Sequence, residues 1–447
     1  MAKRTLIRLA AVAGAASLVL AGCGTETDDT AADTETGSDL TEVELAETDC
    51  DPPQAEPSGN PSTDPLRFGG LLPQTGDLAF LGPPEIAATE LAVSEINEAG
   101  GVLGSPVSIN QGDSGDTTTN IANQTVDRLL ADGAQVIVGA ASSGVSLSVI
   151  DKIVDAGVVM FSPANTSDQF VCYPDRGMYF RTAPTDVLQS QALVQMMAGD
   201  GVQRVSILAR NDPYGAGLAR NTERFLQEAG IAGDQIDLII YDPNAQSFNA
   251  EIDRIAQFDP DGIAVIGFDE SKRIITRMAE VGIGPQDKLV YGTDGNMGNA
   301  LGEGLPAGLL EGMKGTAPQT ALSGDFEERV RQAGQEAGFT LSDLQYSAEA
   351  YDAVIISALA AEAAASTNGV DIAAEINGVT QDGEDCTSFA ECRDLIADGQ
   401  DINYNGVTGD LEFRPAGEPG IGSYGVLEFG PDNQLLEVED YIIVSID

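Results

Sequence analysis

The sequence predicts an α/β protein made of two similar lobes, each with a parallel sheet that helices cover on both faces. Short apolar runs alternate with longer segments of helical period between residues 66 and 163, and the same rhythm begins again at residue 185. Such alternation is typical of parallel strands, which are buried on both faces and connected through helices. The chain has 447 residues, of which 42% are hydrophobic, and this is enough for two packed cores.

The first lobe is expected to follow a β-α-β-α-β-α-β order. Its first helix would turn Ile86, Leu91, Val93 and Ile96 inward and end at residues 100–101, since glycine commonly stops a helix. We predict strands at residues 66–73, 106–113, 134–140 and 158–163, and helices at residues 83–101, 119–133 and 144–157.

The second lobe repeats this order, and the chain then returns between the lobes. In open parallel sheets, ligands bind beyond the carboxyl ends of the strands. Two lobes that face each other across that edge would form a cleft able to close on a small molecule. We predict helices at residues 185–201, 213–230, 250–258, 271–282 and 347–366, and strands at residues 204–210, 235–242, 262–268, 288–294, 410–415, 423–429 and 436–446.

The N-terminus is typical of an export signal. A basic head at residues 3–8 precedes an apolar run at residues 9–20, which is too short to span a bilayer. The run ends in "LAGC", which resembles a bacterial lipobox. This implies a signal peptide at residues 1–22, cleavage before Cys23, and a lipid on that cysteine. The alternative is a plain secretory signal with a chance cysteine.

Residues 23–65 are predicted to form an acidic disordered tether. Between Gly24 and Asp64 there are thirteen acidic residues and no basic one. Such a segment cannot bury a core. We therefore expect the folded lobes on the extracytoplasmic face of the cell membrane, held there through the N-terminal lipid alone.

The charge and composition argue against several classes of function. The formal net charge is −49, from 71 acidic and 22 basic residues, and such a surface repels the phosphate backbone of a nucleic acid. The chain has no histidine, so "GDSGD" at residues 112–116 cannot belong to a Ser-His-Asp triad. The sequence also contains no P-loop and no zinc-ligand cluster. We expect a protein that is not an enzyme and that uses no cofactor and no metal.

The four downstream cysteines are candidates for disulfides, because an exported chain meets an oxidising environment. Four cysteines allow three pairings, and free buried thiols are a further alternative. Cys386 and Cys392 are close in sequence and are expected to pair locally, which leaves Cys50 with Cys172. The second bridge would pin the N-terminal segment to the loop just after "SPANT".

Polar and aromatic side chains gather just after the predicted strands. A ligand carboxylate could accept hydrogen bonds from Ser143, Thr166 and free amides at a helix N-terminus, whose dipole favours negative charge. A ligand ammonium could donate to Asp294. Because neither charge could be buried alone at low cost, these strand ends predict a site for a small zwitterion. The residues concerned are 141–144, 162–166, 211–214, 268–269 and 293–295.

Each of these residues also has a purely structural interpretation. A serine at a helix start often caps the helix, and an Asp-Pro pair often opens one. The structural alternatives are N-caps for Ser142 and Ser143, the first helical turn for Tyr214, and turn positions for Thr166 and Asp294.

With these residues the chain resembles the type I periplasmic binding proteins of branched-chain amino-acid ABC transporters, the Leu/Ile/Val-binding kind. The resemblance runs from about residue 66 to the C-terminus and is carried by "GLLPQTGDLAFLG", "AVSEINEAGGVLG", "GAASSGVSLSVID", "SPANTSD", "FRTAPTD", "DPYGAGLA" and "YGTDG". It implies two Rossmann-like lobes joined by three crossovers. We place the crossovers near residues 181–182, 316–320 and 404–410, lobe 1 at residues 66–182 and 319–408, and lobe 2 at residues 183–318 and 409–447.

The resemblance also implies roles for individual residues. The carboxylate-binding positions of the family fall on Ser143, the backbone of Ala164, and Thr166, with Ser142 beside them. The ligand-facing tyrosine of the family matches Tyr214.

The remaining positions include two departures from the family. Asp294 takes the place of the ammonium-binding acid, which is usually a glutamate and one methylene longer. Phe268 matches an aromatic that faces the ligand, but its neighbour Asp269 departs from the pattern and could either face solvent or recognise a polar ligand side chain. The first loop would supply an apolar wall from Leu78, Phe80 and Leu81.

The C-terminal part carries a further resemblance. "TSFAEC" and the following "DINYNGVTGDLEF" resemble a disulfide hairpin and a third hinge of actinobacterial-type members, which supports the pairing of Cys386 with Cys392.

The resemblance implies an ABC-transporter solute-binding protein. Such a protein would capture an amino acid of branched-chain type, or a similar small zwitterion or amide, by hinge closure and deliver it to a membrane permease driven by a cytoplasmic ATPase. We expect a monomer. The alternative is a ligand-sensing receptor or regulator with the same fold.

Overall fold

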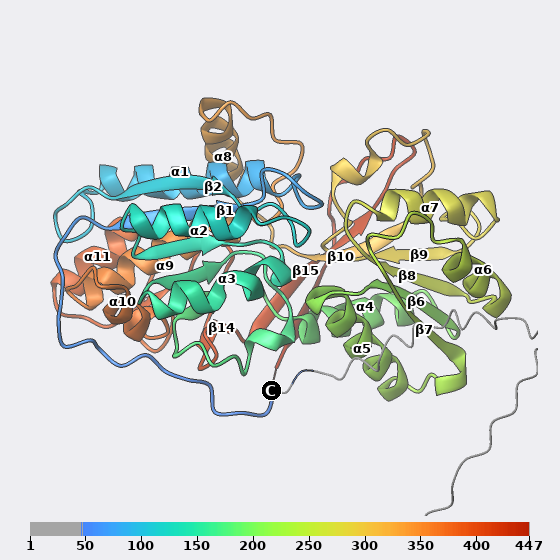
Figure 1. Cartoon of the computed structure of the whole chain (residues 1–447), viewed down its shortest axis with the longest axis horizontal. Coiled ribbons are helices and arrows are strands. Elements are labelled where there is room, and N and C mark those ends of the chain that lie inside the picture. Colours follow the sequence, from blue (N-terminus) through green and yellow to red (C-terminus); the bar gives the residue numbers. More distant parts are fainter. Residues whose placement is uncertain (1–45, 47, 447) are drawn as a thin grey trace, which may run out of the picture. The chain divides into compact units, whose positions relative to one another are not determined.

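The computed structural model of the protein describes residues 46 and 48–446. The expected signal peptide, the lipidation site at Cys23 and most of the expected tether lie outside the described residues. Within those residues, no helix combines the length and the apolar character needed to cross a membrane. Two sheets with helices on both faces make up most of the described chain (Figure 1).

The first sheet has five parallel strands in the order β2-β1-β3-β4-β5. The strands are β1 (Arg67–Leu72), β2 (Ser108–Asp113), β3 (Val136–Gly139), β4 (Val159–Ser162) and β5 (Tyr179–Arg181). The helices of this lobe are α1 (Gly82–Glu98), α2 (Ile121–Ala131), α3 (Ser143–Asp155), α8 (Gly324–Glu336), α9 (Ser347–Ala363), α10 (Gly369–Ile376) and α11 (Phe389–Ala397).

Two adjacent glycines of β1 show how closely helices approach this sheet. A Cβ on Gly69 would meet the side chain of Leu129 in α2, while one on Gly70 would meet the side chain of Gln111. That Gln111 side chain donates to the hydroxyl of Thr89 in α1 at 3.0 Å. Because successive residues of a strand point to opposite faces, α2 and α1 cover opposite faces of the sheet.

The second sheet has seven strands in the order β16-β15-β10-β9-β8-β6-β7. The strands are β6 (Val205–Arg210), β7 (Ile236–Tyr241), β8 (Gly262–Ile266), β9 (Leu289–Gly292), β10 (Lys314–Pro318), β15 (Ile421–Glu428) and β16 (Tyr441–Ser445). The helices that pack on this sheet are α4 (Asp186–Gly199), α5 (Pro213–Glu228), α6 (Asn249–Phe258) and α7 (Ser271–Glu280).

This second sheet is mixed, whereas the sequence predicted a sheet like the first. Strand β15 runs antiparallel to β10, and β16 runs antiparallel to β15. The chain reverses direction just after β15, where the N–H of Gly430 donates to the backbone oxygen of Gln434 at 2.8 Å. A turn of this kind returns the chain beside the strand it has just left, and only antiparallel pairing is then available.

The chain passes between the two sheets three times: at residues 182–185, at residues 319–323, and at Gly420. The third crossover comes later than the predicted residues 404–410. Leu411 and Phe413 pack into the core of the first lobe. The short strands β13 (Phe413–Arg414) and β14 (Glu418–Pro419) pair there, and Gly417 accepts a backbone hydrogen bond from Arg181 of β5 at 2.9 Å.

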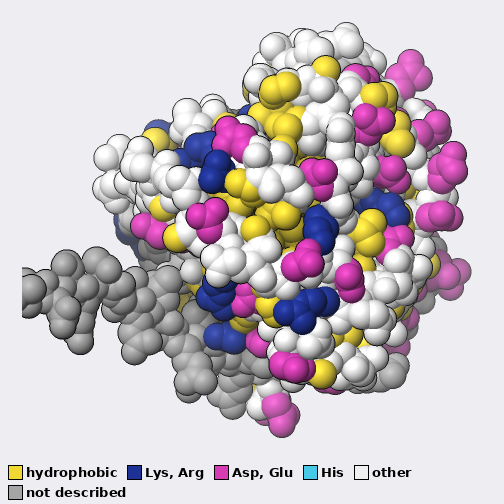
Figure 2. All heavy atoms as spheres, turned by 90° about the vertical axis from the view of Figure 1, so that its right-hand side faces the viewer, with side chains coloured by type: hydrophobic (Ala, Val, Ile, Leu, Met, Phe, Trp, Pro, Cys, Tyr) yellow, Lys and Arg dark blue, Asp and Glu magenta, His cyan; other side chains and the backbone are white. Residues whose placement is uncertain are grey.

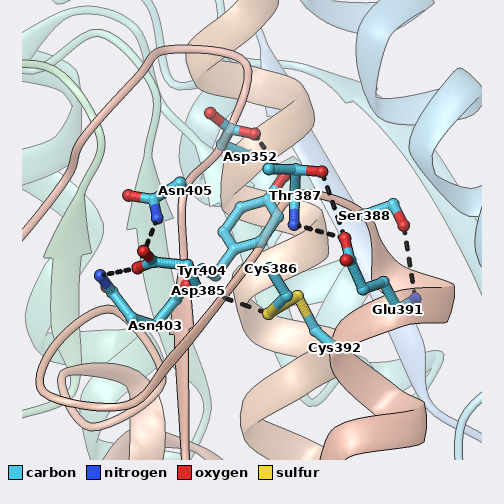
Figure 3. Close-up of a disulfide and its surroundings, with 10 residues drawn as sticks. All are labelled: Asp352, Asp385, Cys386, Thr387, Ser388, Glu391, Cys392, Asn403, Tyr404 and Asn405. Carbon is cyan, nitrogen blue, oxygen red and sulfur yellow. Dashed lines mark hydrogen bonds between the residues drawn. A yellow bond between two sulfur atoms is a disulfide. The ribbon is translucent and has the colours of Figure 1, made fainter.

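Both expected disulfides are present. Cys50 and Cys172 are joined across a sequence separation of 122, which ties the N-terminal segment to the first lobe. Cys386 and Cys392 are joined across a separation of 6, between β11 (Glu384–Cys386) and α11 (Figure 3).

Polar contacts attach the second disulfide's surroundings to the first lobe. Strand β11 pairs with β12 (Ile402–Tyr404), and the hydroxyl of Tyr404 donates to the buried carboxyl of Asp352 in α9 at 2.7 Å (Figure 3). The same carboxyl accepts from the hydroxyl of Thr408 at 2.6 Å. Residues 384–408 therefore belong to the first lobe.

Basic side chains on the second lobe are engaged by acidic neighbours. Arg254 pairs with Asp237 at 2.5 Å, and Arg277 pairs with Glu280 at 3.0 Å. Figure 2 shows acidic and basic side chains interspersed on the α6–α7 end of this lobe, with acidic ones projecting from its rim.

Candidate functional site

The loops after β3 and β4 are braced by two side chains of the "SPANT" segment. The hydroxyl of Ser162 donates to the backbone oxygen of Ala140 at 2.7 Å and accepts from the N–H of Asn165 at 2.9 Å. The side-chain amide of Asn165 donates to the backbone oxygens of Ala140 and Ala141 at 3.0 and 2.8 Å. With the loop fixed in this way, Ala164 and Thr166 line the space between the lobes.

The two serines that open α3 have different surroundings. Ser142 is the N-cap, and its side chain accepts from the N–H of Val145 at 3.5 Å. Ser143 is the first helical residue, is buried, and accepts from the N–H of Ser167 at 3.4 Å. The structural alternative therefore describes Ser142, while Ser143 lies at the edge of the cavity described below.

The carboxyl of Asp294, which follows β9, accepts from two tyrosines. The hydroxyl of Tyr214 in α5 donates to Oδ1 at 2.8 Å, and the hydroxyl of Tyr346 donates to Oδ2 at 2.8 Å. Tyr346 directly precedes α9, a helix of the first lobe. Asp294 is thus held from both lobes at once.

An aromatic stack forms the neighbouring wall. The ring of Phe268, which follows β8, is stacked on Tyr214 with the ring centroids 5.3 Å apart. The guanidinium carbon of Arg210 lies 3.5 Å from the centroid of the Phe268 ring. A Cβ on Gly295 would lie 2.7 Å from this ring, so glycine is needed beside Asp294 for the phenyl group to fit.

These side chains from the two lobes enclose one small cavity. Its volume is about 10 Å³, which is roughly the space of a single water. It brings together most of the residues that the sequence suggested, and it adds Ala141 and Tyr346. The lining residues are Leu78, Leu81, Ala141, Ser143, Ala164, Thr166, Tyr214, Phe268, Asp294, Gly295 and Tyr346.

Unpartnered acceptors lie close to this cavity. Both carboxyl oxygens of Asp186, at the start of α4, are buried and have no hydrogen-bond partner among the described residues. The side-chain oxygen of Gln189 and the hydroxyl of Thr166 also make no hydrogen bond within the described chain, although the Thr166 hydroxyl lies close enough to Asp186 to lower the pKa of that carboxyl. After burial and the charge of Asp168, the charge of Asp294 also raises the pKa of Asp186, so Asp186 and Asp294 lie near each other. Buried acceptors without partners are rare in folded proteins and point to a missing donor.

Acidic side chains are in excess around the cavity. Burial raises the pKa of Asp294, and it raises the pKa of Asp186 far above the ordinary range, with a further contribution from Asp168. Burial also raises the pKa of Asp168 to about 6, against the lowering effect of Arg181. The buried Arg181 is itself paired with Glu418 at 2.5 Å. This surplus of carboxyls favours a ligand that carries a positive group.

Two of the expected residues are placed outside the cavity. Asp269 is exposed and pairs with Lys272 at 2.7 Å. Phe80 is partly buried and packs against the apolar cluster that includes Leu78 and Leu81. Both Phe80 and Asp269 border a separate hollow of about 370 Å³. The solvent-facing alternative therefore describes Asp269.

Sequence reasoning missed Asp186 and Tyr346. Asp186 lies in the "FRTAPTD" motif, but its position at a helix start made it look like an ordinary first-turn acid. Tyr346 precedes a helix and follows no strand, so the rule that strand ends supply ligands did not apply to it. Within the described residues, no three histidine, cysteine, aspartate or glutamate side chains are placed to hold a metal ion.

Comparison with known proteins places the chain in a family. A family model described as "Periplasmic binding protein" matches residues 65–403. Leu/Ile/Val-binding protein homolog 2 from Brucella abortus is 27% identical over 382 residues, which cover 83% of this chain and 92% of that protein. The chemotactic signal transduction system substrate-binding protein BasB from Halobacterium salinarum is 26% identical over 374 residues, which cover 80% of this chain and 86% of that protein.

Solved structures show the same fold. The leucine-binding protein LivK from Thermotoga maritima matches with a TM-score of 0.68 at 21% identity, covering 84% of this chain and 98% of that one. LivJ from Streptococcus pneumoniae, a branched-chain amino acid transporter substrate-binding protein in complex with isoleucine, also matches with a TM-score of 0.68 at 21% identity, covering 86% of this chain and 100% of that one. The family model, the relatives and the two-lobed architecture agree, and the chain belongs to the periplasmic binding protein family.

Proposed function

We propose that this protein is an extracytoplasmic solute-binding protein of an ABC importer, and that it binds an amino acid of branched-chain type, or a similar small zwitterion or amide, between its lobes. The observation that carries the proposal is the cavity in which Ser143 and Thr166 of the first lobe face Tyr214 and Asp294 of the second. Relatives named as Leu/Ile/Val-binding proteins support the same ligand class.

The proposed arrangement divides the two charges of the ligand between the lobes. The carboxylate would accept from Ser143, from the hydroxyl of Thr166 and from amides at the start of α3, where the helix dipole favours an anion. The ammonium would donate to Asp294 and to the unpartnered carboxyl of Asp186. An apolar side chain would lie against Leu78, Leu81 and Phe268.

Binding would require the lobes to part and close again. A cavity of about 10 Å³ cannot admit an amino acid in the arrangement described here. Contacts between the lobes are available to favour closure: the hydroxyl of Ser167 donates to the backbone oxygen of Pro213 at 2.9 Å, and Asn221 donates to Asp168. A ligand that bridges the lobes would shift the population toward the closed form, which a permease could then recognise.

The proposal extends to location and partners. A lipid on Cys23 would hold the monomer at the extracytoplasmic face of the cell membrane, and a permease with its cytoplasmic ATPase would accept the ligand. In the proposed arrangement, residues 66–182 belong to lobe 1 and residues 183–318 belong to lobe 2.

A second candidate function is ligand sensing. The relative BasB is named as a substrate-binding protein of a chemotactic signal transduction system. Uptake of a labelled amino acid, measured in cells that grow on it as the only nitrogen source, separates the two functions. Loss of this protein should abolish uptake of the labelled amino acid if it serves an importer, and should leave uptake intact if it serves a sensor.

A thermal-shift screen tests the proposed ligand class. We expect a branched-chain amino acid or a similar zwitterion to raise the melting temperature of the purified protein, because a ligand at 100 times its Kd stabilises the folded state by about 2.7 kcal/mol. Decarboxylated and N-acetylated forms of the same compound serve as controls, and each should lose the effect. A panel in which the forms with one charge stabilise as well as the zwitterion would contradict the proposed division of charge.

Asp186→Asn should improve the stability of the ligand-free protein while weakening ligand binding. Burial raises the pKa of Asp186, so the folded state holds this proton more tightly than the unfolded state. The wild type therefore loses stability as pH rises from the ordinary range of an aspartate through the raised folded value, and the amide variant escapes this loss. Melting temperatures across the pH range should diverge toward alkaline pH, with the variant higher.

The matched control for this test is Asp269→Asn, which changes an exposed acid outside the cavity. It should leave both the pH profile and the ligand affinity unchanged. If Asp186→Asn binds the cognate amino acid as tightly as the wild type, Asp186 does not contact the ammonium.

A further inference from the structure

A second, much larger cavity lies beside the first one. Its volume is about 430 Å³, within the range of small-molecule sites. Tyr346 lines both cavities, and so the same residue belongs to the wall of each. Its neighbour Gln345 also lines the larger cavity and donates to the backbone oxygen of Asp294 at 2.7 Å. Residues 345–346 therefore separate the two spaces while they are bonded to Asp294, and one ligand can reach both only when the lobes part and these hydrogen bonds break.

Glu349 lines the larger cavity with a carboxyl that has no cationic partner. It lies one helical turn beyond Tyr346 on α9, and only 6% of its surface is exposed. Burial raises the pKa of Glu349 to about 8, with a contribution from Asp352, and no cation is among the influences on it. A hydrogen bond from its own backbone N–H lowers this pKa in part. A carboxyl buried this deeply without a cation is costly to the fold, and a cationic donor that entered the cavity would offset that cost.

Two further acceptors near this wall also lack partners. Both carboxyl oxygens of Glu85 in α1 are buried without a hydrogen bond among the described residues, and Glu349 raises the pKa of Glu85 further. The side-chain oxygen of Gln345 is likewise buried and unpartnered. The acceptors outnumber the donors on this side of the cavity.

The other walls combine apolar side chains with the charged residues Glu327, Arg331, Asp343 and Glu437. Leu344, Leu427 and Leu435 contribute hydrocarbon surface. The guanidinium of Arg331, which also lines the cavity, donates to the backbone oxygen of Leu341 at 2.8 Å. A group that fits here has an alkyl stem and ends in hydrogen-bond donors.

We propose that this cavity is a side-chain chamber of the ligand site, and that it takes the extended side chain of an amino acid that ends in an ammonium or a guanidinium, with Glu349 as the acceptor. This inference rests on the proposed function, because it needs the backbone charges of the ligand to be held at Asp294 and Thr166. It changes the preferred ligand from a short apolar side chain to a long cationic one.

Calorimetry with L-lysine and L-norleucine tests the chamber, since the two amino acids share a carbon chain and differ in the terminal ammonium. The wild type should bind lysine at least about tenfold more tightly than norleucine, which corresponds to about 1.4 kcal/mol. Glu349→Gln, which keeps the shape but cannot ionise to pair with a bound cation, should lose this preference while its affinity for norleucine stays the same. Its melting temperature without ligand reports whether the variant is folded.

Glu328→Gln is the matched control, because Glu328 is exposed on α8 and makes the same change in net charge. It should keep the full preference for lysine. The chamber is wrong if the wild type binds lysine no better than norleucine, or if Glu349→Gln weakens both equally, and the proposed function survives in either case because norleucine still binds. If neither compound nor any other amino acid binds, the proposed function fails and this inference fails with it.

Discussion

Asp294→Ala should reduce the affinity for the cognate amino acid by about 100-fold or more. Removing one partner of a buried charge pair typically costs about 3–5 kcal/mol, because the remaining charge is left without compensation. In this protein the ligand ammonium would lose its acceptor, and the hydroxyls of Tyr214 and Tyr346 would lose theirs as well. Titration calorimetry with the ligand identified in the thermal-shift screen measures the loss.

The control for this prediction is Asp269→Ala. Asp269 is the same residue type and also follows a strand of the second lobe, but it is exposed and paired with Lys272. We expect its replacement to leave the affinity unchanged. A variant lacking the Asp294 carboxyl that binds with wild-type affinity would place the ligand elsewhere.

Arg181→Met should destabilise the protein by about 3–5 kcal/mol. The Arg181 side chain is fully buried where the chain leaves the first sheet. It pairs with Glu418 of β14 and donates to the backbone oxygen of Ser167 at 2.7 Å. Without the guanidinium, Asp168 would lose the cation that lowers its pKa, and Glu418 would keep only Arg414, 3.4 Å away, as a cationic partner.

The pH dependence of this loss is a second readout. Because burial raises the pKa of Asp168 and Arg181 lowers it, the folded-state pKa of Asp168 would rise further in the variant, which should lose stability as pH increases and approach the wild type at acidic pH. Denaturant unfolding at several pH values measures the effect. The double variant Arg181→Met, Glu418→Leu should recover much of the loss, whereas a double variant that is less stable than Arg181→Met alone would show that Glu418 does not depend on the arginine.

The regular alternation of strand and helix could be predicted from the sequence, and so could the positions of several site residues at the ends of strands. Ser143, Thr166 and Tyr214 come shortly after predicted strands and Asp294 ends one, and the carboxyl ends of parallel strands lie at one edge of a sheet. The pairing of Cys386 with Cys392 could also be predicted, because cysteines that are close in sequence often pair with each other.

Residues that reach the cavity from other directions could not be predicted in this way. Tyr346 arrives from a helix start in the returning part of the chain, and Asp186 arrives from the first turn of α4. The late third crossover was missed for a related reason: Phe413 sits in a short strand whose apolar residues suit either core, and only the packing of the first lobe selects one.

The sequence by itself determined that this is a two-lobed α/β protein with polar strand ends facing a cleft. Hydrophobic periodicity, and the order in which strands and helices follow one another along the chain, are local properties that a sequence displays directly. Only the tertiary structure decided which acids become neighbours, which tyrosines hold Asp294, and that Glu349 is buried in the wall of a second cavity. Burial and charge pairing depend on residues far apart in the chain, and they exist only when the lobes are folded and packed together.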